Sequence, residues 1–261
     1  MLIAVASVKG SPGATTVALG LACVWPAGGA VVVEADPAGG DLAARFGHSM
    51  TPGLVTLAAA NRSGAAGADV GEHAQRLADL GVDVVLAPPD PSAEAGVRAL
   101  VSTSGGELVV GGAARAVVCD VGRLAETSAA MPLVRHADRV LVVVRPWVED
   151  QAHLQARLWW LRQAAGDRLG LVLAGTGPYS AADISRAWGS RCWGRCRSMT
   201  AVPGFSPEGS PLGAGICGLW PARSGISPTL SSAPPRCPPG SVPHERAFAP
   251  GPGRRVVAVD G

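Results

Sequence analysis

Short apolar runs alternate with longer segments of helical spacing from Met1 to about Ile184. The apolar runs are rich in Val, Leu and Ala, which is typical of strands buried on both faces of a sheet. We predict strands at Leu2–Val8, Ala30–Glu34, Val82–Ala87, Ala116–Asp120, Arg139–Arg145 and Leu169–Ala174. We predict helices at Thr15–Val24, Ala93–Ser102, Glu126–His136 and Glu149–Ala164. This order predicts an α/β fold, with a doubly wound, mostly parallel sheet and helices on both of its faces.

The connecting segments and the end of the chain have a different composition. Ala60–Val70 and Ser102–Gly112 are rich in Gly, Ala and Ser, which is typical of connections. After about Ser185 no periodicity remains, and Pro, Gly and Ser dominate between Pro203 and Arg255. We therefore predict one domain over residues 1–186 and an irregular C-terminal tail over residues 187–261.

The tail can be interpreted as a natural disordered segment or as the product of a shifted reading frame. A single lysine against 21 arginines, together with abundant Ala, Gly and Pro, indicates a GC-rich gene, so the degenerate codons can be assigned. With those codons, translation of Ala187–Gly194 from two bases later gives Leu-Gly-Val-Pro-Val-Leu-Gly, the pattern of a buried strand. We hypothesise a frameshift near Arg186–Trp188, and sequencing the gene across that point would test it.

The charge and hydropathy of the chain indicate which partners and which cellular compartment to expect. The chain has 22 basic and 20 acidic residues, and its formal net charge is +2. This balance gives no bulk electrostatic support for nucleic acid or an anionic membrane as a partner. No apolar stretch of about 18 residues occurs, and no charged leader precedes the first apolar run. We expect a cytoplasmic protein.

A glycine-containing loop joins the first predicted strand to the first predicted helix. Its sequence is Val5-Ala-Ser-Val-Lys9-Gly10-Ser11-Pro12-Gly13-Ala14-Thr15-Thr16. Backbone N–H groups in such a loop and at the start of the helix can hold a phosphate group. The segment resembles the deviant phosphate loop (Walker A motif) of the ParA/MinD family of P-loop ATPases, whose pattern is Lys-Gly-Gly-x-Gly-Lys-Thr-Thr.

The resemblance assigns roles to the loop residues. Lys9, the only lysine in the chain, matches the family's first lysine, which is thought to reach across a dimer to the partner's nucleotide. The Thr15 hydroxyl matches the family's Mg²⁺ ligand, although Thr15 and Thr16 can also be interpreted as caps of the helix. The resemblance implies that ATP phosphates are bound by Gly10, Ser11, Gly13, Ala14, Thr15 and Thr16.

Two loop positions depart from the family pattern. Ser11 replaces a glycine, and Ala14 replaces the second lysine, which in P-loop proteins contacts the β- and γ-phosphates. Loss of such a charge-assisted contact costs roughly 10²–10³ in rate when the contact acts mainly in the transition state. We therefore expect hydrolysis of ATP to be weak or absent, while the backbone, Thr15 and Mg²⁺ can still support binding.

Acidic residues end two of the predicted strands. The second strand runs into Val33-Glu34-Ala35-Asp36-Pro37-Ala38-Gly39-Gly40-Asp41, which resembles the family's Asp-x-Asp-Pro-x-Gly. Glu34 and Asp36 lie two residues apart on one face, so both carboxylates can approach the phosphate end of the sheet. The resemblance gives Asp36 a catalytic role, in positioning the attacking water and Mg²⁺. A turn is the alternative interpretation of this segment.

The apolar run Ala116-Val-Val-Cys-Asp120-Val-Gly122 resembles a Walker B strand, whose terminal aspartate reaches Mg²⁺ directly or through water. Asp120 is thus a candidate metal ligand together with Thr15, and a helix cap or turn is the alternative. The three motifs occur in the family's order and are expected at the same edge of the sheet.

The resemblance implies an ATP-binding protein with Mg²⁺ as its second cofactor. It implies a nucleotide-dependent homodimer that acts as a switch in chromosome partitioning, cell division or cargo positioning, with an unidentified protein partner or cargo. A non-catalytic scaffold or pseudo-ATPase is the main alternative, because Ala14 removes a catalytic charge. A dinucleotide-binding enzyme is a weaker one, because Gly10-x-x-Gly13 lacks the Gly-x-Gly-x-x-Gly pattern.

Overall fold

The computed structural model describes residues 1–10, 12–25, 29–63, 68–102, 108 and 116–189, and the backbone of residues 103–104 and 191–196. These residues belong to one unit, which spans Met1–Ala222. Within them the strands are β1 (Leu2–Ser7), β2 (Ala30–Glu34), β3 (Gln75–Leu77), β4 (Val82–Val85), β5 (Ala116–Arg123), β6 (Arg139–Val144), β7 (Leu169–Ala174) and β8 (Arg191–Cys196). The α-helices are α1 (Ala14–Cys23), α2 (Leu42–Phe46), α3 (Leu54–Arg62), α4 (Ser92–Ser104), α5 (Met131–His136), α6 (Val148–Gln155), α7 (Leu158–Ala165) and α8 (Ala181–Trp188).

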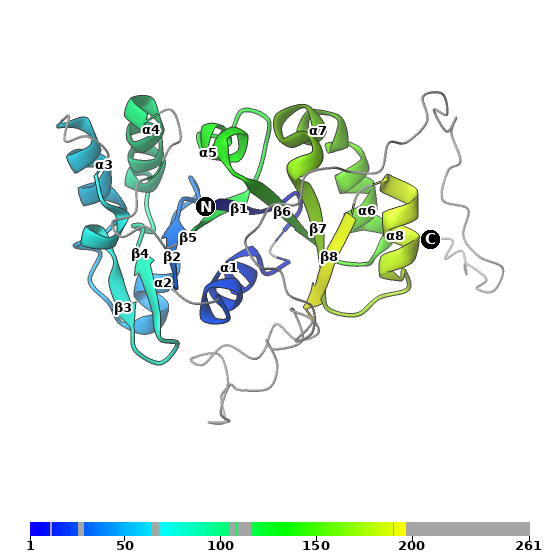
Figure 1. Cartoon of the computed structure of the whole chain (residues 1–261), viewed down its shortest axis with the longest axis horizontal. Coiled ribbons are helices and arrows are strands. Elements are labelled where there is room, and N and C mark those ends of the chain that lie inside the picture. Colours follow the sequence, from blue (N-terminus) through cyan, green and yellow to red (C-terminus); the bar gives the residue numbers. More distant parts are fainter. Residues whose placement is uncertain are drawn as a thin grey trace, which may run out of the picture. The chain divides into compact units, whose positions relative to one another are not determined.

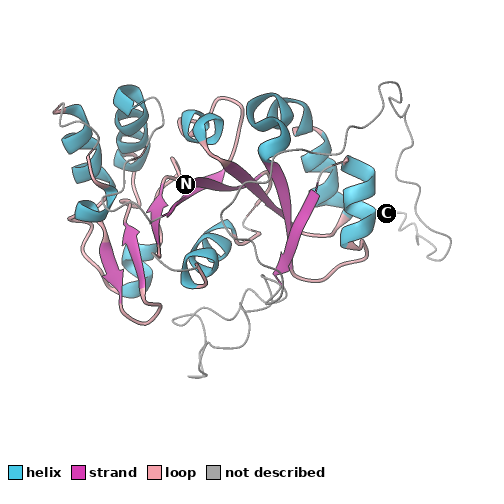
Figure 2. Cartoon of the chain, viewed as in Figure 1, coloured by secondary structure: helices cyan, strands magenta, loops and turns pink. Residues whose placement is uncertain are grey.

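The strands form one sheet in the order β3-β4-β2-β5-β1-β6-β7-β8. Every pair is parallel except β3 with β4, which is antiparallel. Two apolar clusters cover the two faces: one contains side chains of α1 and α2, and the other contains side chains of α3, α4, α5 and α7. Figures 1 and 2 show α1 on the face of the sheet opposite α4, α5 and α7. The predicted doubly wound, mostly parallel α/β fold is confirmed.

The first strand lies at the centre of the sheet and brings three strand ends together. β1 pairs with β5 on one side and with β6 on the other. Because the three strands are parallel, the residues that follow each of them meet at one edge of the sheet. In open α/β sheets this edge, outside the carboxyl ends of the strands, is where ligands bind.

The elements differ from the predictions at several places. The predicted helix Glu126–His136 begins only at Met131, with Pro132 in its first turn, where proline is favoured. The predicted helix Glu149–Ala164 is two helices, α6 and α7. The elements β3, α2, α3 and α8 were not predicted.

Regular structure also extends past the predicted domain boundary at residue 186. Helix α8 continues to Trp188, and β8 pairs in parallel with β7, from Gly170 opposite Arg191 to Ala174 opposite Cys196. Regular structure therefore reaches Cys196, whereas the sequence predicted an irregular segment from residue 187. Residues 197–261 lie outside the described residues, so the tail and the frameshift stay predictions.

A search of the described helices finds none that is both long enough and apolar enough to span a membrane.

Candidate phosphate-binding site

The loop after β1 presents the start of α1 to the edge of the sheet. Gly10 and Gly13 have φ angles of 53° and 96°, in the left-handed region that favours glycine. Gly13 is the residue that caps α1, and within the described residues no side chain caps it and no acid lies in its first turn. The first N–H groups of α1 and its positive dipole end are thus available for an anion. Ser11, a predicted phosphate ligand, lies outside the described residues.

The remaining predicted loop residues lie together around this helix start. Ala14 is buried against the sheet, Thr15 and Thr16 are half-buried in the first turn of α1, and Lys9 is half-buried just before the loop. Ala14 contributes only a methyl group at the position where the family carries its second lysine. The helix start therefore has backbone donors and hydroxyls but no cationic side chain of its own.

Asp120 reaches this helix start from the neighbouring strand. Its side chain is buried, it accepts a hydrogen bond of 3.1 Å from the Gly122 N–H, and it hydrogen-bonds with the Thr15 side chain. Between Val5 opposite Asp120 and Ser7 opposite Arg123, the register of β1 and β5 shifts. Such bulges bend a strand and re-aim its side chains, often beside active sites. The predicted pair of metal ligands, Thr15 and Asp120, is in contact.

Asp36 approaches the same point from the end of β2. Its Oδ1 accepts a hydrogen bond of 2.8 Å from the Ala38 N–H, and its carboxyl group lies directly over the Cα of Gly122. Gly122 has a φ of 61°, and a Cβ there would fall on this carboxyl group. The absence of a side chain at Gly122 thus lets Asp36 lie beside Asp120.

Glu34 lies opposite Asp120 at the end of β2, and its carboxyl group is held by backbone donors. Its Oε1 accepts hydrogen bonds of 3.0 Å from the N–H groups of Asp41 and Leu42, and its Oε2 accepts one of 3.0 Å from Ala87. The buried Glu34 carboxylate therefore ties the end of β2 to the start of α2 and to the segment after β4.

The carboxyl groups at this edge resist ionisation. Burial raises the pKa of Asp120 to about 6, and hydrogen bonds from Thr15 and Gly122 only partly offset it. Burial raises the pKa of Glu34 to about 7 and also raises the pKa of Asp36. The Asp36 carboxylate raises the pKa of Asp120 further, so a cation nearby would favour ionisation of Asp120.

These residues fit Mg²⁺ in the manner of a nucleotide site. The described part of the chain holds no group of three or more His, Cys, Asp or Glu residues placed to bind a metal. Mg²⁺ at phosphate sites, however, is usually held by one or two protein ligands, phosphate oxygens and water. The Thr15 hydroxyl and the Asp120 carboxylate are hard oxygen ligands of that kind, and Asp36 lies close to them.

One charged residue at this edge was missed as a site residue in the sequence. Arg145 follows β6, and its Nη2 atom lies 3.9 Å from the point that a Cβ on Gly10 would occupy. Sequence reasoning used the segment that contains Arg145 only as support for the fold. The strand order, which puts β6 beside β1, is the information that connects Arg145 to the loop.

Solved structures of known proteins share the fold of this chain. No family model matches the sequence, and no curated protein matches it. Among solved structures, the cell division ATPase MinD of Pyrococcus furiosus superposes with a TM-score of 0.59 at 16% identity, over 84% of this chain and 94% of that one. A ParA family ATPase of Chlorobium tepidum TLS gives a TM-score of 0.58 at 15% identity, over 76% and 84% of the two chains.

A putative plasmid partition protein of Borrelia burgdorferi B31, bound to AMPPNP, gives a TM-score of 0.58 at 13% identity, over 84% and 94% of the two chains. The structures that share this arrangement of strands and helices thus include ParA and MinD proteins from distant organisms. The chain has the fold of the ParA/MinD ATPases.

Proposed function

We propose that this protein binds ATP together with Mg²⁺ at the loop between β1 and α1, and hydrolyses it weakly or not at all. The observation that carries the proposal is the meeting of an uncapped helix start with Thr15, Asp120 and Asp36 at one edge of the sheet. Backbone donors suit the phosphates, and the oxygen ligands suit the metal. Bound Mg²⁺ would neutralise phosphate charge and bridge phosphate oxygens.

The roles of the individual residues follow their positions. Gly10, Ser11, Gly13, Ala14, Thr15 and Thr16 form the phosphate-binding segment, Thr15 and Asp120 hold Mg²⁺, and Asp36 positions the attacking water. Ala14 supports slow turnover, because the loop lacks the lysine that neutralises the β- and γ-phosphates in active P-loop enzymes.

The biological role that we propose is that of a cytoplasmic switch. ATP binding would favour a homodimer in which Lys9 contacts the partner's nucleotide, and the dimer would position a cargo during chromosome partitioning, cell division or a related process. The fold shared with MinD and with plasmid partition proteins supports this role. A scaffold that binds nucleotide without turnover is the second candidate, and Ala14 favours it.

The experiment is titration of a fluorescent ATP analogue with and without Mg²⁺, followed by a phosphate-release assay. Wild-type protein is compared with Asp36→Ala and Lys9→Ala. We expect Mg²⁺-dependent binding by all three proteins, with little release by wild type and less by Asp36→Ala. Binding with no release by any protein would favour the scaffold. No binding by folded wild-type protein would contradict the nucleotide proposal.

A further inference from the structure

Arg145 extends a row of side chains that faces α1. β6 pairs with β1 up to Val143 opposite Ser7, and Arg145 follows directly after the end of β6. Leu141 and Val143 belong to the apolar cluster that contains the buried residues of α1. Because side chains two apart on a strand point to the same face, Arg145 continues this row past the end of β6, on the side where the loop enters α1.

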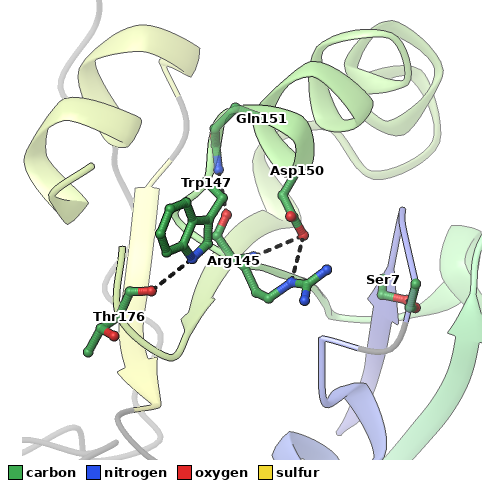
Figure 3. Close-up of polar contacts among 7 residues, drawn as sticks. Ser7, Arg145, Trp147, Asp150, Gln151 and Thr176 are labelled. Atoms are coloured by element: carbon green, nitrogen blue, oxygen red, sulfur yellow. Dashed lines mark hydrogen bonds and ion pairs between the residues drawn. The ribbon is translucent and has the colours of Figure 1, made fainter. Parts of the chain in front are cut away.

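The guanidinium group reaches the start of the phosphate loop. Its Nη2 lies 3.9 Å from the Cβ position of Gly10, and Figure 3 shows the side chain extending from the end of its strand toward Ser7 of β1. The Arg145 side chain is 42% exposed, so a ligand can reach it. Within the described residues, no hydrogen bond from Nη1 or Nη2 is present.

Asp150 of α6 holds this side chain from behind. Its Oδ1 accepts hydrogen bonds from the Arg145 Nε at 3.3 Å and from the Arg145 N–H at 3.4 Å (Figure 3). The Asp150 side chain is only 2% exposed, and its Oδ2 has no hydrogen-bond partner in the described structure. A buried carboxylate with a bare oxygen is costly, and such groups in native proteins call for an explanation. The Oδ1 atom of Asp150 engages only the Nε of the guanidinium group, so both Nη groups stay available to a ligand.

The backbone around Arg145 is also fixed. The Gln151 side chain donates a hydrogen bond of 3.0 Å to the Arg145 carbonyl, and the Trp147 Nε1 donates one of 3.0 Å to the Thr176 carbonyl (Figure 3). Gly177 packs against Pro146 so closely that a Cβ there would collide with it. The turn after β6 is thus attached to both α6 and the segment after β7. These contacts restrict the backbone of Arg145, which favours precise placement of its side chain.

We propose that Arg145 contacts the β/γ-phosphate end of the bound nucleotide and supplies the positive charge that Ala14 withholds, with Asp150 as its positioning residue. The inference rests on the proposed function, because it assigns a residue to the same nucleotide site. An arginine suits the task, since its planar group can donate two hydrogen bonds to one phosphate.

The test measures ATP affinity in the presence of Mg²⁺ for four proteins: wild type, Arg145→Gln, Ala14→Lys and the double variant. Arg145→Gln is expected to weaken ATP binding about 10- to 100-fold, as loss of a charge-assisted phosphate contact does. In the double variant, the lysine returned to the loop is expected to restore most of that affinity. Ala14→Lys alone is expected to gain less, because Arg145 already supplies the charge.

Two further variants separate binding from folding and from net charge. Arg139→Gln removes the same charge from the opposite end of β6 and is expected to leave ATP affinity unchanged. Asp150→Asn is expected to weaken ATP binding in wild type but to have no further effect in Arg145→Gln, which a merely structural role would not produce. Circular dichroism melting confirms that each variant is folded.

The outcomes of the two proposals differ. If wild type binds ATP and folded Arg145→Gln binds it equally well, the role of Arg145 is overturned and the proposed function stands. If Arg145→Gln is weak and Ala14→Lys does not rescue it, the charge replacement is overturned. If folded wild type binds neither ATP nor ADP, the proposed function itself fails, and the assignment of Arg145 fails with it.

Discussion

Among single residues, Asp120 is one whose proposed metal-binding role lowers the stability of the metal-free folded protein. Its folded-state pKa of about 6 is above the ordinary aspartate value of 3.8, so ionisation is harder in the folded protein than in the unfolded chain. Ionised Asp120 therefore lowers the free energy of unfolding above pH 6, and this loss disappears as the pH falls toward 4. A metal ion would relieve it at neutral pH instead.

We therefore expect Asp120→Asn to stabilise the metal-free protein at pH 7.5 by about 1–3 kcal/mol, because a neutral amide can still accept from Gly122 without the cost of a buried charge. The measurement is urea unfolding with a chelator present. The advantage should shrink as the pH is lowered to 4.5, where wild-type Asp120 is protonated. An Asp120→Asn protein that is less stable than wild type at pH 7.5 would contradict this account.

Glu34 is also buried with a raised pKa, but it differs from Asp120 because its two carboxyl oxygens accept hydrogen bonds from three backbone N–H groups. Glu34→Gln places an NH₂ group near the Ala87 N–H or near those of Asp41 and Leu42, so a donor faces a donor. We expect a loss of about 1–3 kcal/mol in the free energy of unfolding. The same urea titration measures it. Equal stability of Glu34→Gln and wild type would show that this clamp contributes little.

At the scale of elements, the bulge in β5 brings Asp36 and Asp120 together. We expect Gly122→Ala to cost roughly 1–3 kcal/mol, because alanine disfavours a φ of 61° and its Cβ displaces the Asp36 carboxyl group. It should also reduce Mg²⁺-dependent ATP binding in the fluorescence titration. Gly81→Ala is a control, since Gly81 has a similar φ of 62° at a turn far along the chain from these residues. If both variants lose stability but neither loses ATP binding, the close approach at Gly122 is irrelevant to the site.

Helices and strands were predicted correctly from the sequence where a single hydrophobic pattern was sufficient to identify them. Six strands were located because each is a run of apolar residues buried on both sides. The break between α6 and α7 was missed because the buried positions Gln151, Leu154, Leu158 and Leu161 keep helical spacing across it. Helix α3 was not predicted, although its buried residues also have helical spacing: Leu54, Leu57, Ala58 and Asn61.

The candidate site was predicted to the extent that its residues lie in contiguous motifs. The loop, Thr15 and Asp120 come together as expected, since each ends or follows a strand of a parallel sheet. Arg145 and Asp150 were not assigned, because their meeting with the loop depends on strand order, which no local pattern contains. The hydrogen-bond partners of Glu34 were not predicted, because alternation along a strand shows only the face of the sheet to which a side chain points.

At the scale of the whole molecule, the proposed switch requires a second copy. We expect wild type with ATP and Mg²⁺ to elute as a dimer in size-exclusion chromatography with light scattering, and Lys9→Ala to stay largely monomeric while it still binds ATP. Arg76→Ala, which removes an exposed ion pair with Asp83, serves as a surface control. A Lys9→Ala protein that dimerises as well as wild type would show that Lys9 does not bridge the subunits.

The central position of β1, between β5 and β6, also bears on how such a site can evolve. A residue that follows either neighbouring strand is within reach of the loop, so a cation can arise there while the loop lysine is still present. The lysine can then be lost without passing through a form that cannot bind its ligand. Ala14 and Arg145 fit such an exchange. The phosphate loop would then no longer match its sequence pattern, while a positive charge would still lie beside the bound phosphates.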